Sequence, residues 1–404
     1  MATTPTADGT PRSTAIDPMT AARELAARFA AGAAERDRTN AFPHDEIREL
    51  RASGLLPLIV PAEHGGLDAD TLTVTRVVSA LAEGDPSIAQ MYLIHTLEIL
   101  VLRNALIDEA ARDELYRSVV DGSLFFTNAW SETGTRSMVD FGVALRRDPA
   151  GGWRIDGRKF YATGSLAGDL ILSAGVTDED EPRVLTALVP ADAPGVRIHD
   201  DWDGFGQRTT ASGTVSFEDV PLPDALVFDV PSVTQPDNAF GSFSQIMFTS
   251  VLVGIARNAL AESVAFVRQR ARPWIHSGVE RAADDPHVQA LVGRMRVQVS
   301  TADAMLERAA LIREPAARTP SPAARDAASV AVAEAKVVAT ETALRVSETA
   351  IQIGGASAAL AKHGLDRHWR NARTVSLHDP VHYKLVLVGD AELNGTPPPI
   401  SVYT

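Results

Sequence analysis

The stretch GQRTTASGTVSFEDVPLP, residues 206–223, is the most informative part of this chain about its fold. Together with Gly204 it resembles the start of a phosphate-binding loop. The third glycine of such a loop is missing, however, and no helix-forming run follows. The residues that do follow, Thr214–Phe217, suit a strand. We therefore interpret the stretch as a tight turn inside a β domain.

The sequence around this turn has the same β character. From about Phe125 to Phe228, short β-branched or aromatic runs alternate with turn signals such as Gly151-Gly152 and Asp156-Gly157. No helical pattern separates these runs, which excludes a parallel sheet built from strand–helix–strand units. We expect a small antiparallel barrel or sandwich. The predicted strands include Trp153–Ile155, Leu170–Val176, Val184–Val189 and Thr214–Phe217.

Helical patterns occupy both flanks of the β region. Asp17 and Pro18 form a helix start, and the stretch PHDEIRELRASGLLPLIVPAEHGG (43–66) predicts a helix, a glycine stop and an extended run. After Asn238 the helical period returns. Two apolar stripes there predict an antiparallel bundle, one of Leu291, Met295, Val299 and Leu306, the other of Val330, Val337, Leu344 and Ile351.

The expected fold is thus mainly α with a central β domain. We predict a disordered tail at 1–16, an N-terminal helical domain at 17–124, a β-barrel domain at 125–236 and a C-terminal four-helix bundle at 237–404.

Composition excludes several classes of protein. The chain has 404 residues, with 38 basic against 52 acidic side chains, and no run of Lys and Arg, so we expect no nucleic-acid partner. The absence of cysteine excludes disulfides, thiolate nucleophiles and iron–sulfur clusters. The first seventeen residues lack the apolar core of a signal peptide, which favours a cytoplasmic protein.

Other sites and a membrane location have little support. The uncharged stretch Asn238–Ala256 carries too many polar side chains for a typical membrane span, so we expect no membrane association. His378 and His382 have the spacing of metal ligands, but Pro380 lies between them, and we predict no metal.

Four segments together resemble the acyl-CoA dehydrogenase superfamily of flavoproteins. They are the stretch 43–66, Ser131-Glu132-Thr133-Gly134, WRIDGRKFYATGS (153–165) and the turn stretch 206–223. The ending RHWRNARTVSLHDPVHYK (367–384) is similar to the dibenzothiophene monooxygenase branch. At the position where the dehydrogenases carry a catalytic glutamate, our alignment places His378, or Asp379 if the register shifts by one residue.

The resemblance implies the oxygenase component of a two-component monooxygenase. Such an enzyme uses reduced FMN, with FAD as the alternative, and O₂ to oxygenate a small apolar substrate, with sulfur favoured over nitrogen or aromatic carbon. No nicotinamide fingerprint is present, so a separate NAD(P)H:flavin reductase is expected to supply the reduced flavin. The superfamily also implies a homotetramer.

The resemblance assigns roles to individual residues. His95, Ser165 and His378 occupy positions for holding and protonating the activated oxygen in a dry pocket. Flavin contacts are implied for Asn128, Trp130, Ser131, Thr163, Ser165, Trp202, Arg270, Arg272, Gly354, Gly355 and Arg373.

Each role has a structural alternative. His95 suits a buried core histidine, Ser165 a turn residue and His378 a helix boundary before Asp-Pro. The arginines suit exposed ion pairs, and Gly354-Gly355 suits a simple helix stop.

Two other functions remain open. An FAD-dependent acyl-CoA dehydrogenase would need a carboxylate base, which Asp379 would supply. A catalytically silent flavin-binding subunit would tolerate loss of the His378 imidazole.

Overall fold

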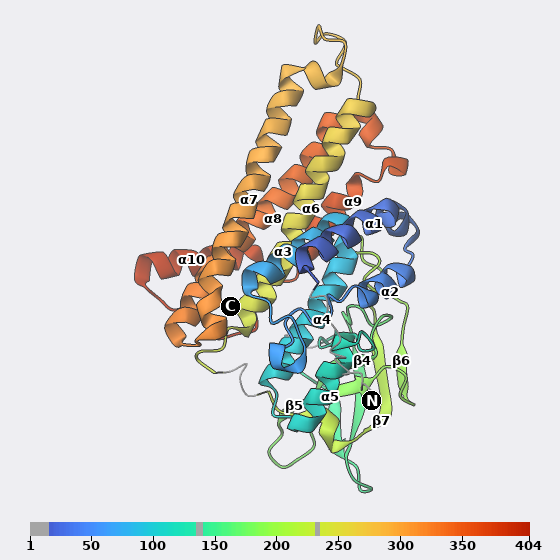
Figure 1. Ribbon diagram of the computed structural model, residues 1–404, viewed down its shortest axis with the longest axis vertical. Coiled ribbons are helices and arrows are strands. Elements are labelled where there is room, and N and C mark those ends of the chain that lie inside the picture. Colours follow the sequence, from blue (N-terminus) through green and yellow to red (C-terminus); the bar gives the residue numbers. More distant parts are fainter. Residues whose placement is uncertain (1–15, 135–139, 231–234) are drawn as a thin grey trace, which may run out of the picture.

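The chain forms a layer of helices, a curled sheet and a second set of longer helices, in that order along the sequence (Figure 1). The computed structural model describes residues 16–134, 140–230 and 235–404. The tail predicted at 1–16 lies outside these residues, except for Ile16.

The first layer of helices begins where the sequence predicts. Asp17 caps the first helix by accepting a hydrogen bond from the backbone N–H of Thr20 at 3.0 Å. Asp85 caps the fourth helix in the same way, and that helix is buried along most of its length. The elements are α1 (Pro18–Thr39), α2 (His44–Ala52), η1 (Ala62–His64), α3 (Thr71–Gly84), α4 (Pro86–Asn104) and α5 (Glu109–Val120).

The middle of the chain forms one mixed sheet. Its strand order is β6-β7-β3-β2-β4-β5-β8, with β1 also paired to β4. The strands are β1 (Phe126–Ala129), β2 (Ala144–Arg147), β3 (Trp153–Lys159), β4 (Leu170–Thr177), β5 (Val184–Pro190), β6 (Val196–Ile198), β7 (Val215–Leu222) and β8 (Val227–Phe228), with the short helix η2 (Asp224–Leu226) before β8. The four predicted strands lie at β3, β4, β5 and β7.

The predicted antiparallel barrel is wrong in two respects. Strands β1 and β2 run parallel to β4, and the sheet curls into a half-barrel whose edge strands β6 and β8 do not pair with each other. These edges are short, three and two residues, so they offer little backbone for closing a barrel. Alternation of residues within a strand does not reveal which strand it pairs with or in which direction.

The last part of the chain contains three long helices that pack along one another (Figure 1). They are α6 (Phe240–Gln269), α7 (Pro286–Arg318) and α8 (Pro322–Ala358), with η4 (Ala282–Asp284) before α7. After η5 (Ala361–His363), α9 (Asp366–Ser376) lies on α6 and α8, whereas α10 (Val381–Asn394) packs mainly on α8 and projects to one side. The expected four-helix bundle is therefore three long helices plus two short ones.

The apolar stripes differ in how far they are buried. Met295, Val299 and Leu306 of α7 are buried as predicted. In α8 alanine is the most frequent buried residue, while Val330, Leu344 and Ile351 of the predicted stripe are only partly covered.

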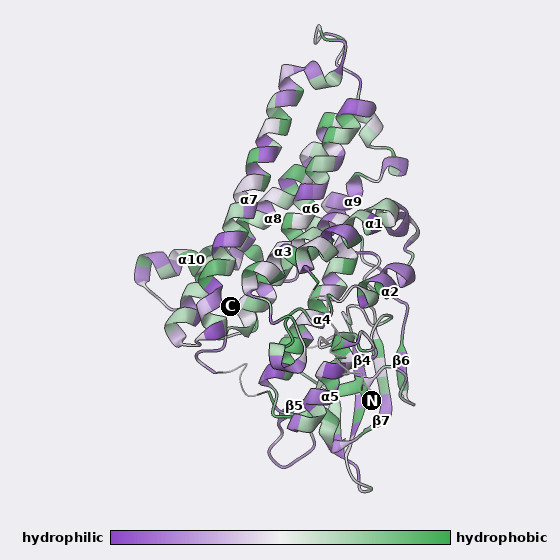
Figure 2. Ribbon diagram, viewed as in Figure 1, coloured by the Kyte–Doolittle hydropathy of each residue, from purple (hydrophilic) through white to green (hydrophobic). Residues whose placement is uncertain are grey.

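Small residues let α6 cross the first helical layer closely. A Cβ on Gly254 would lie 2.5 Å from the Cβ of Ala82 and the carbonyl oxygen of Ser79, both on α3. Figure 2 shows hydrophobic residues along this crossing. By length and composition α6 would pass for a membrane span, but 72% of its most apolar window is buried inside the protein, as in a core helix.

Ammonium groups are unusually buried. The chain has four lysines, and three of them, Lys159, Lys336 and Lys384, lie inside the protein in ion pairs. Lys159 pairs with Glu132 at 2.6 Å, which ties the end of β3 to the loop after β1. Lys336 and Lys384 both pair with Asp379.

Candidate functional site

His95 lies where α4 packs on the start of β1. Its Nε2 is 3.1 Å from the carbonyl oxygen of Leu56, and its Nδ1 accepts the backbone N–H of Phe126 at 3.0 Å. The ring is fully buried and stacks on Phe125 with 4.8 Å between ring centroids. Burial lowers the pKa of His95 to about 3, so the imidazole is neutral with Nε2–H as the donor. Both ring nitrogens therefore bond to the backbone, as in the structural alternative, and the predicted catalytic role stays a prediction.

Glu98, one turn after His95, was missed by the sequence analysis. The side-chain amide of Asn128 donates to its Oε1 at 3.0 Å, whereas its Oε2 has no hydrogen-bond partner among the described residues. The side chain is 2% exposed, and burial raises the pKa of Glu98 to about 8. The available signal was an acidic residue three positions after His95 in an otherwise apolar run.

Ser165 and Thr163 lie in a cluster of buried hydroxyl groups. The Thr163 Oγ1 is 2.9 Å from the Oγ of Ser212, which is 2.7 Å from the Oγ1 of Thr210. The Ser165 hydroxyl donates to the carbonyl oxygen of Ala211 at 3.0 Å and keeps its own oxygen available as an acceptor. The structure thus brings together two predicted residues with two that the sequence analysis did not single out.

The cluster is held by a strained backbone. Three residues beside it adopt positive φ without being glycine: Tyr161 at 57°, Gln207 at 49° and Ala211 at 48°. Such conformations cost free energy and persist where the surroundings fix them, often at functional sites.

Gln207 fixes the turn stretch to both helical parts. Its backbone N–H donates to the side-chain oxygen of Asn371 on α9 at 2.7 Å, and its Nε2 donates to the Gln90 oxygen on α4 at 2.7 Å. Its carbonyl oxygen accepts from the indole N–H of Trp202 at 2.8 Å. A Cβ on Gly206 would lie 2.1 Å from the carbonyl oxygen of Arg370, so α9 touches the turn directly.

Aromatic rings border this cluster. Trp202 lies 6.0 Å from the ring of Tyr161, which is 58% exposed, and Trp130 lies 5.8 Å from Phe141. Ser131 pairs with Phe160 across the neighbouring backbone, so the predicted loop and the predicted hairpin are in contact. Half-buried rings of this kind suit a planar aromatic ligand.

The turn between α9 and α10 separates the two candidates for the base position. Asp379 is buried, with Oδ2 at 2.8 Å from the Nζ of Lys384 and Oδ1 in contact with Lys336. Burial alone would raise the pKa of Asp379, but the two ammonium groups lower it. His378 is exposed on one side and stacks on Phe248 with 3.8 Å between ring centroids. Desolvation against its neighbours and the charge of Lys336 lower the pKa of His378.

Four of the predicted flavin residues lie elsewhere. Arg270 and Arg272 are exposed after the end of α6. Gly354 and Gly355 lie close to this end of α6, since a Cβ on Gly354 would lie 3.1 Å from the ring of Phe266. This end of the bundle is remote from the sheet (Figure 1), so one chain does not bring the two groups together.

The backbone at this bundle end is open. Gly355 leaves the helical conformation, with φ 62° and ψ −159°, and a Cβ there would meet nothing within 4 Å. At the predicted helix stop, α8 is therefore kinked at Gly355 and continues to Ala358. Arg373, the remaining predicted residue, lies on α9 with its guanidinium 5.9 Å from the Trp369 ring.

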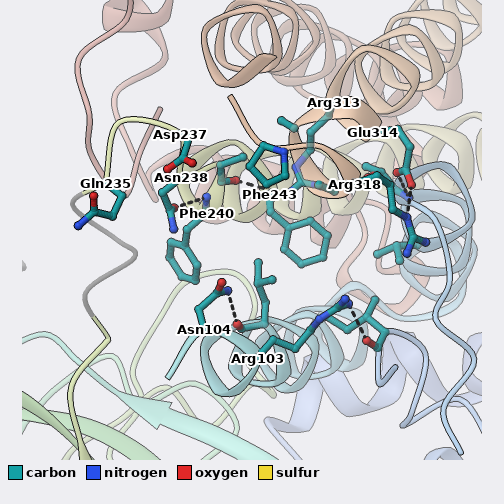
Figure 3. A pocket seen from close by; sticks show the side chains of 18 of the residues that line it. Arg103, Asn104, Gln235, Asp237, Asn238, Phe240, Phe243, Arg313, Glu314 and Arg318 are labelled. Atoms are coloured by element: carbon teal, nitrogen blue, oxygen red, sulfur yellow. Dashed lines mark hydrogen bonds and ion pairs between the residues drawn. The ribbon is translucent and has the colours of Figure 1, made fainter. Parts of the chain in front are cut away.

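A separate cavity of about 440 Å³ opens between α4, α6 and α7. Figure 3 shows Arg313 and Glu314 on one side and Asp237 and Asn238 on the other. The buried Arg313 guanidinium lies 4.5 Å from the Phe243 ring. None of the predicted site residues lines this cavity.

The donor groups near the sheet fit a flavin. Hydroxyl groups, an amide and half-buried rings surround the region. At the far end of the bundle, the exposed arginines and the open backbone at Gly355 suit the phosphate group of a flavin. Only the bundle end of a second chain could bring these groups close to the sheet. No group of three or more His, Asp or Glu side chains gathers for a metal within residues 16–134, 140–230 and 235–404.

Comparisons with known proteins cover nearly the whole chain. Models of the N-terminal, middle and C-terminal domains of acyl-CoA dehydrogenase match residues 18–121, 127–220 and 246–383. Dibenzothiophene monooxygenase of Rhodococcus qingshengii is 33% identical over 396 residues, 95% of this chain and 94% of that protein. The probable FMNH2-dependent monooxygenase SfnC of Pseudomonas putida is 31% identical, over 95% of this chain and 96% of its own. The crystal structure of FMN-bound TdsC from Paenibacillus sp. A11-2 superposes with a TM-score of 0.90 at 32% identity, covering 96% of this chain and 100% of that one.

Proposed function

This chain belongs to the acyl-CoA dehydrogenase family, and we propose that it is the oxygenase component of a two-component flavin-dependent monooxygenase. It takes reduced FMN and O₂ and oxygenates a small, largely apolar substrate at sulfur. Relatives that align along nearly their full length are monooxygenases, one named as FMNH2-dependent and one crystallised with FMN, which supports this choice.

The geometry at the α9–α10 turn favours a monooxygenase over a dehydrogenase. A dehydrogenase base must take a proton from carbon, which requires a carboxylate that is basic and faces the substrate. Asp379 instead binds two buried ammonium groups, which hold its pKa low. Such a carboxylate is a poor base. The neighbouring imidazole of His378, which faces Phe248, is the group left to act on a substrate.

The chain's own residues bind and orient the cofactor. Asn128, Trp130 and Ser131 would hold the flavin ring from one side, with Thr163, Ser165 and Trp202 beside them. Arg270, Arg272, Gly354 and Gly355 would hold the phosphate of a flavin bound mainly by a neighbouring subunit. The separation of these two groups in one chain supports the homotetramer, which we include in the proposal.

The reaction requires few proton movements. Reduced FMN supplies two electrons and two protons, so a thioether and O₂ yield a sulfoxide, oxidised FMN and water. The Ser165 hydroxyl, whose proton binds the carbonyl oxygen of Ala211, offers a hydrogen-bond acceptor beside a buried hydroxyl cluster. His378 offers a nitrogen that passes a proton to the oxygen atom leaving as water. The closely packed wall of α4 and α6 excludes bulk water from this region.

The supply of reduced flavin falls to a partner. A separate NAD(P)H:flavin reductase completes the system, and both proteins act in the cytoplasm in our proposal.

The test combines the protein with FMN, a flavin reductase, NADH and dibenzothiophene under ¹⁸O₂. We expect one ¹⁸O atom in each sulfoxide product, measured by mass spectrometry, and loss of product with His378→Ala. The proposal fails if all reduced flavin ends as hydrogen peroxide with a panel of thioethers. Reduction of bound FAD by an acyl-CoA would then establish the dehydrogenase, and neither reaction would establish a silent flavin-binding subunit.

A further inference from the structure

Glu98 is a buried acid that the mechanism above does not use. It projects from α4, and its side chain is 2% exposed. Its Oε1 accepts a hydrogen bond from the Asn128 side-chain amide at 3.0 Å, and the indole of Trp130, beside the same carboxyl group, lowers the pKa of Glu98 as Asn128 does. The opposite oxygen, Oε2, has no partner within the part of the chain that the structure describes.

An isolated polar atom of this kind needs an explanation. Buried polar groups are almost always hydrogen-bonded, because leaving one unpaired costs about 1–3 kcal/mol. Burial keeps the proton on this carboxyl group at neutral pH. Since Oε1 already accepts from Asn128, the proton belongs on Oε2. Glu98 is thus a hydrogen-bond donor that lacks an acceptor.

The position of Glu98 indicates what the acceptor belongs to. The flavin residues named near the sheet come from strand β1, the loops after it and the hairpin around Thr163. Glu98 comes from the facing helical wall, formed by α4, on the same side as His95. A substrate held against the flavin would lie between these loops and the α4 wall, which is why the missing acceptor is assigned to the substrate.

We propose that Glu98 determines substrate specificity by donating a hydrogen bond from Oε2 to an oxygen or nitrogen acceptor on the substrate. The inference rests on the proposed function and narrows it. The preferred substrate is a sulfur compound that also carries a carbonyl, sulfoxide or ring-nitrogen acceptor, in place of a purely apolar thioether.

A binding experiment tests this without turnover. Acetophenone and α-methylstyrene have nearly the same shape, but only the ketone has an acceptor oxygen. Both are titrated into the FMN-loaded protein, with tryptophan fluorescence as the readout because Trp130 borders Glu98. The wild type should prefer the ketone about tenfold, Glu98→Gln should keep the preference through its amide N–H, and Glu98→Leu should lose it. Glu83→Gln, an exposed acid on α3, is the matched control.

A turnover experiment extends the test. Methyl phenyl sulfide is compared with its 4-acetyl derivative, and the ratio of their kcat/KM values is measured from pH 6 to 9. The wild-type preference for the ketone should fall as Glu98 loses its proton near pH 8, while that of Glu98→Gln stays level. The other titratable groups on this face, His95 and Tyr92, stay neutral throughout that range, because burial lowers the pKa of His95 to about 3 and raises the pKa of Tyr92.

The outcomes are separable. An unchanged preference for the ketone in Glu98→Leu overturns the inference. If Glu98→Leu also binds FMN tenfold more weakly, the acceptor of the Glu98 proton belongs to the flavin and not to the substrate. Oxygenation of neither sulfide, with the ketone preference intact, contradicts the proposed function and leaves the substrate subsite standing.

Discussion

The charge cluster behind His378 makes a quantitative prediction. One carboxylate, Asp379, lies between the ammonium groups of Lys336 and Lys384, and all three side chains are buried. Asp379→Asn keeps the shape of the side chain but removes the only negative charge in this cluster. Lys336→Met removes one positive charge and leaves the pair of Asp379 with Lys384 intact. The two changes should therefore destabilise the protein unequally.

The magnitudes follow from what each change leaves behind. Asp379→Asn leaves two buried ammonium groups without a counter-charge, which costs about 3–5 kcal/mol. Lys336→Met leaves the carbonyl oxygen of the Gln245 side chain without its Lys336 donor, which costs about 1–3 kcal/mol. We expect Asp379→Asn to be worse by about 2 kcal/mol, roughly thirtyfold in the unfolding equilibrium. The double variant should cost no more than Asp379→Asn alone.

Urea unfolding of the four proteins at pH 7, followed by tryptophan fluorescence, measures these differences from the transition midpoints. Equal midpoints for the two single variants, or a double variant at the sum of both losses, would refute the description of Asp379 as the shared counter-charge. Acid provides a second check. Because the folded-state pKa of Asp379 is lowered, its contribution is present above its ordinary pKa and is lost as the pH falls below about 4.

Three further variants give direct tests of the site. The wild type should lose up to about 5 kcal/mol of unfolding free energy as the pH rises from 4.5 to 8, because folded Glu98 keeps a proton that the unfolded chain releases. Glu98→Gln should not show this loss, and urea unfolding at pH 5 and pH 8 measures the difference. Gly206→Ala should push α9 away from the turn stretch, because the new Cβ would lie 2.1 Å from a carbonyl oxygen, and should lower FMN affinity at least tenfold by fluorescence titration. Gly389→Ala, with nothing within 4 Å of its Cβ, is the control and should bind FMN normally. His95→Phe should lower stability by about 2–4 kcal/mol in urea unfolding, because one backbone carbonyl and one backbone N–H lose their partner; a stable but inactive variant would instead support the catalytic role.

Local features of the fold were readable from the sequence. The cap at Asp17, the break in α8 at Gly355 and four strands lie where residue patterns place them, because each depends on neighbours within a few positions. The curl of the sheet was not readable. It depends on β1 and β2 pairing in parallel with β4, a choice made by packing across the domain.

The candidate site also has a part that was predictable from the sequence and a part that was not. The resemblance located Thr163, Ser165 and Trp202 in one region, and the structure places them around one turn stretch. It left His378 and Asp379 as alternatives, because side-chain direction in a turn depends on distant partners such as Lys336. Glu98 was missed for a related reason: its chemistry comes from burial against Asn128, thirty residues away, which no local pattern reveals.

The burial of three of the four lysines also determines how the protein reacts with amine-directed reagents. Lys159, Lys336 and Lys384 are shielded in ion pairs, which leaves Lys362 as the one exposed lysine side chain. Positive charge on the surface is carried by arginine, which such reagents do not modify. A dye or cross-linker will therefore attach to lysine at a single position, in the short helix η5 near Gly354 and Gly355. Besides the α-amino group of the N-terminus, Lys362 is then the amine available to such a reagent, at the end of the bundle where we expect subunits to meet.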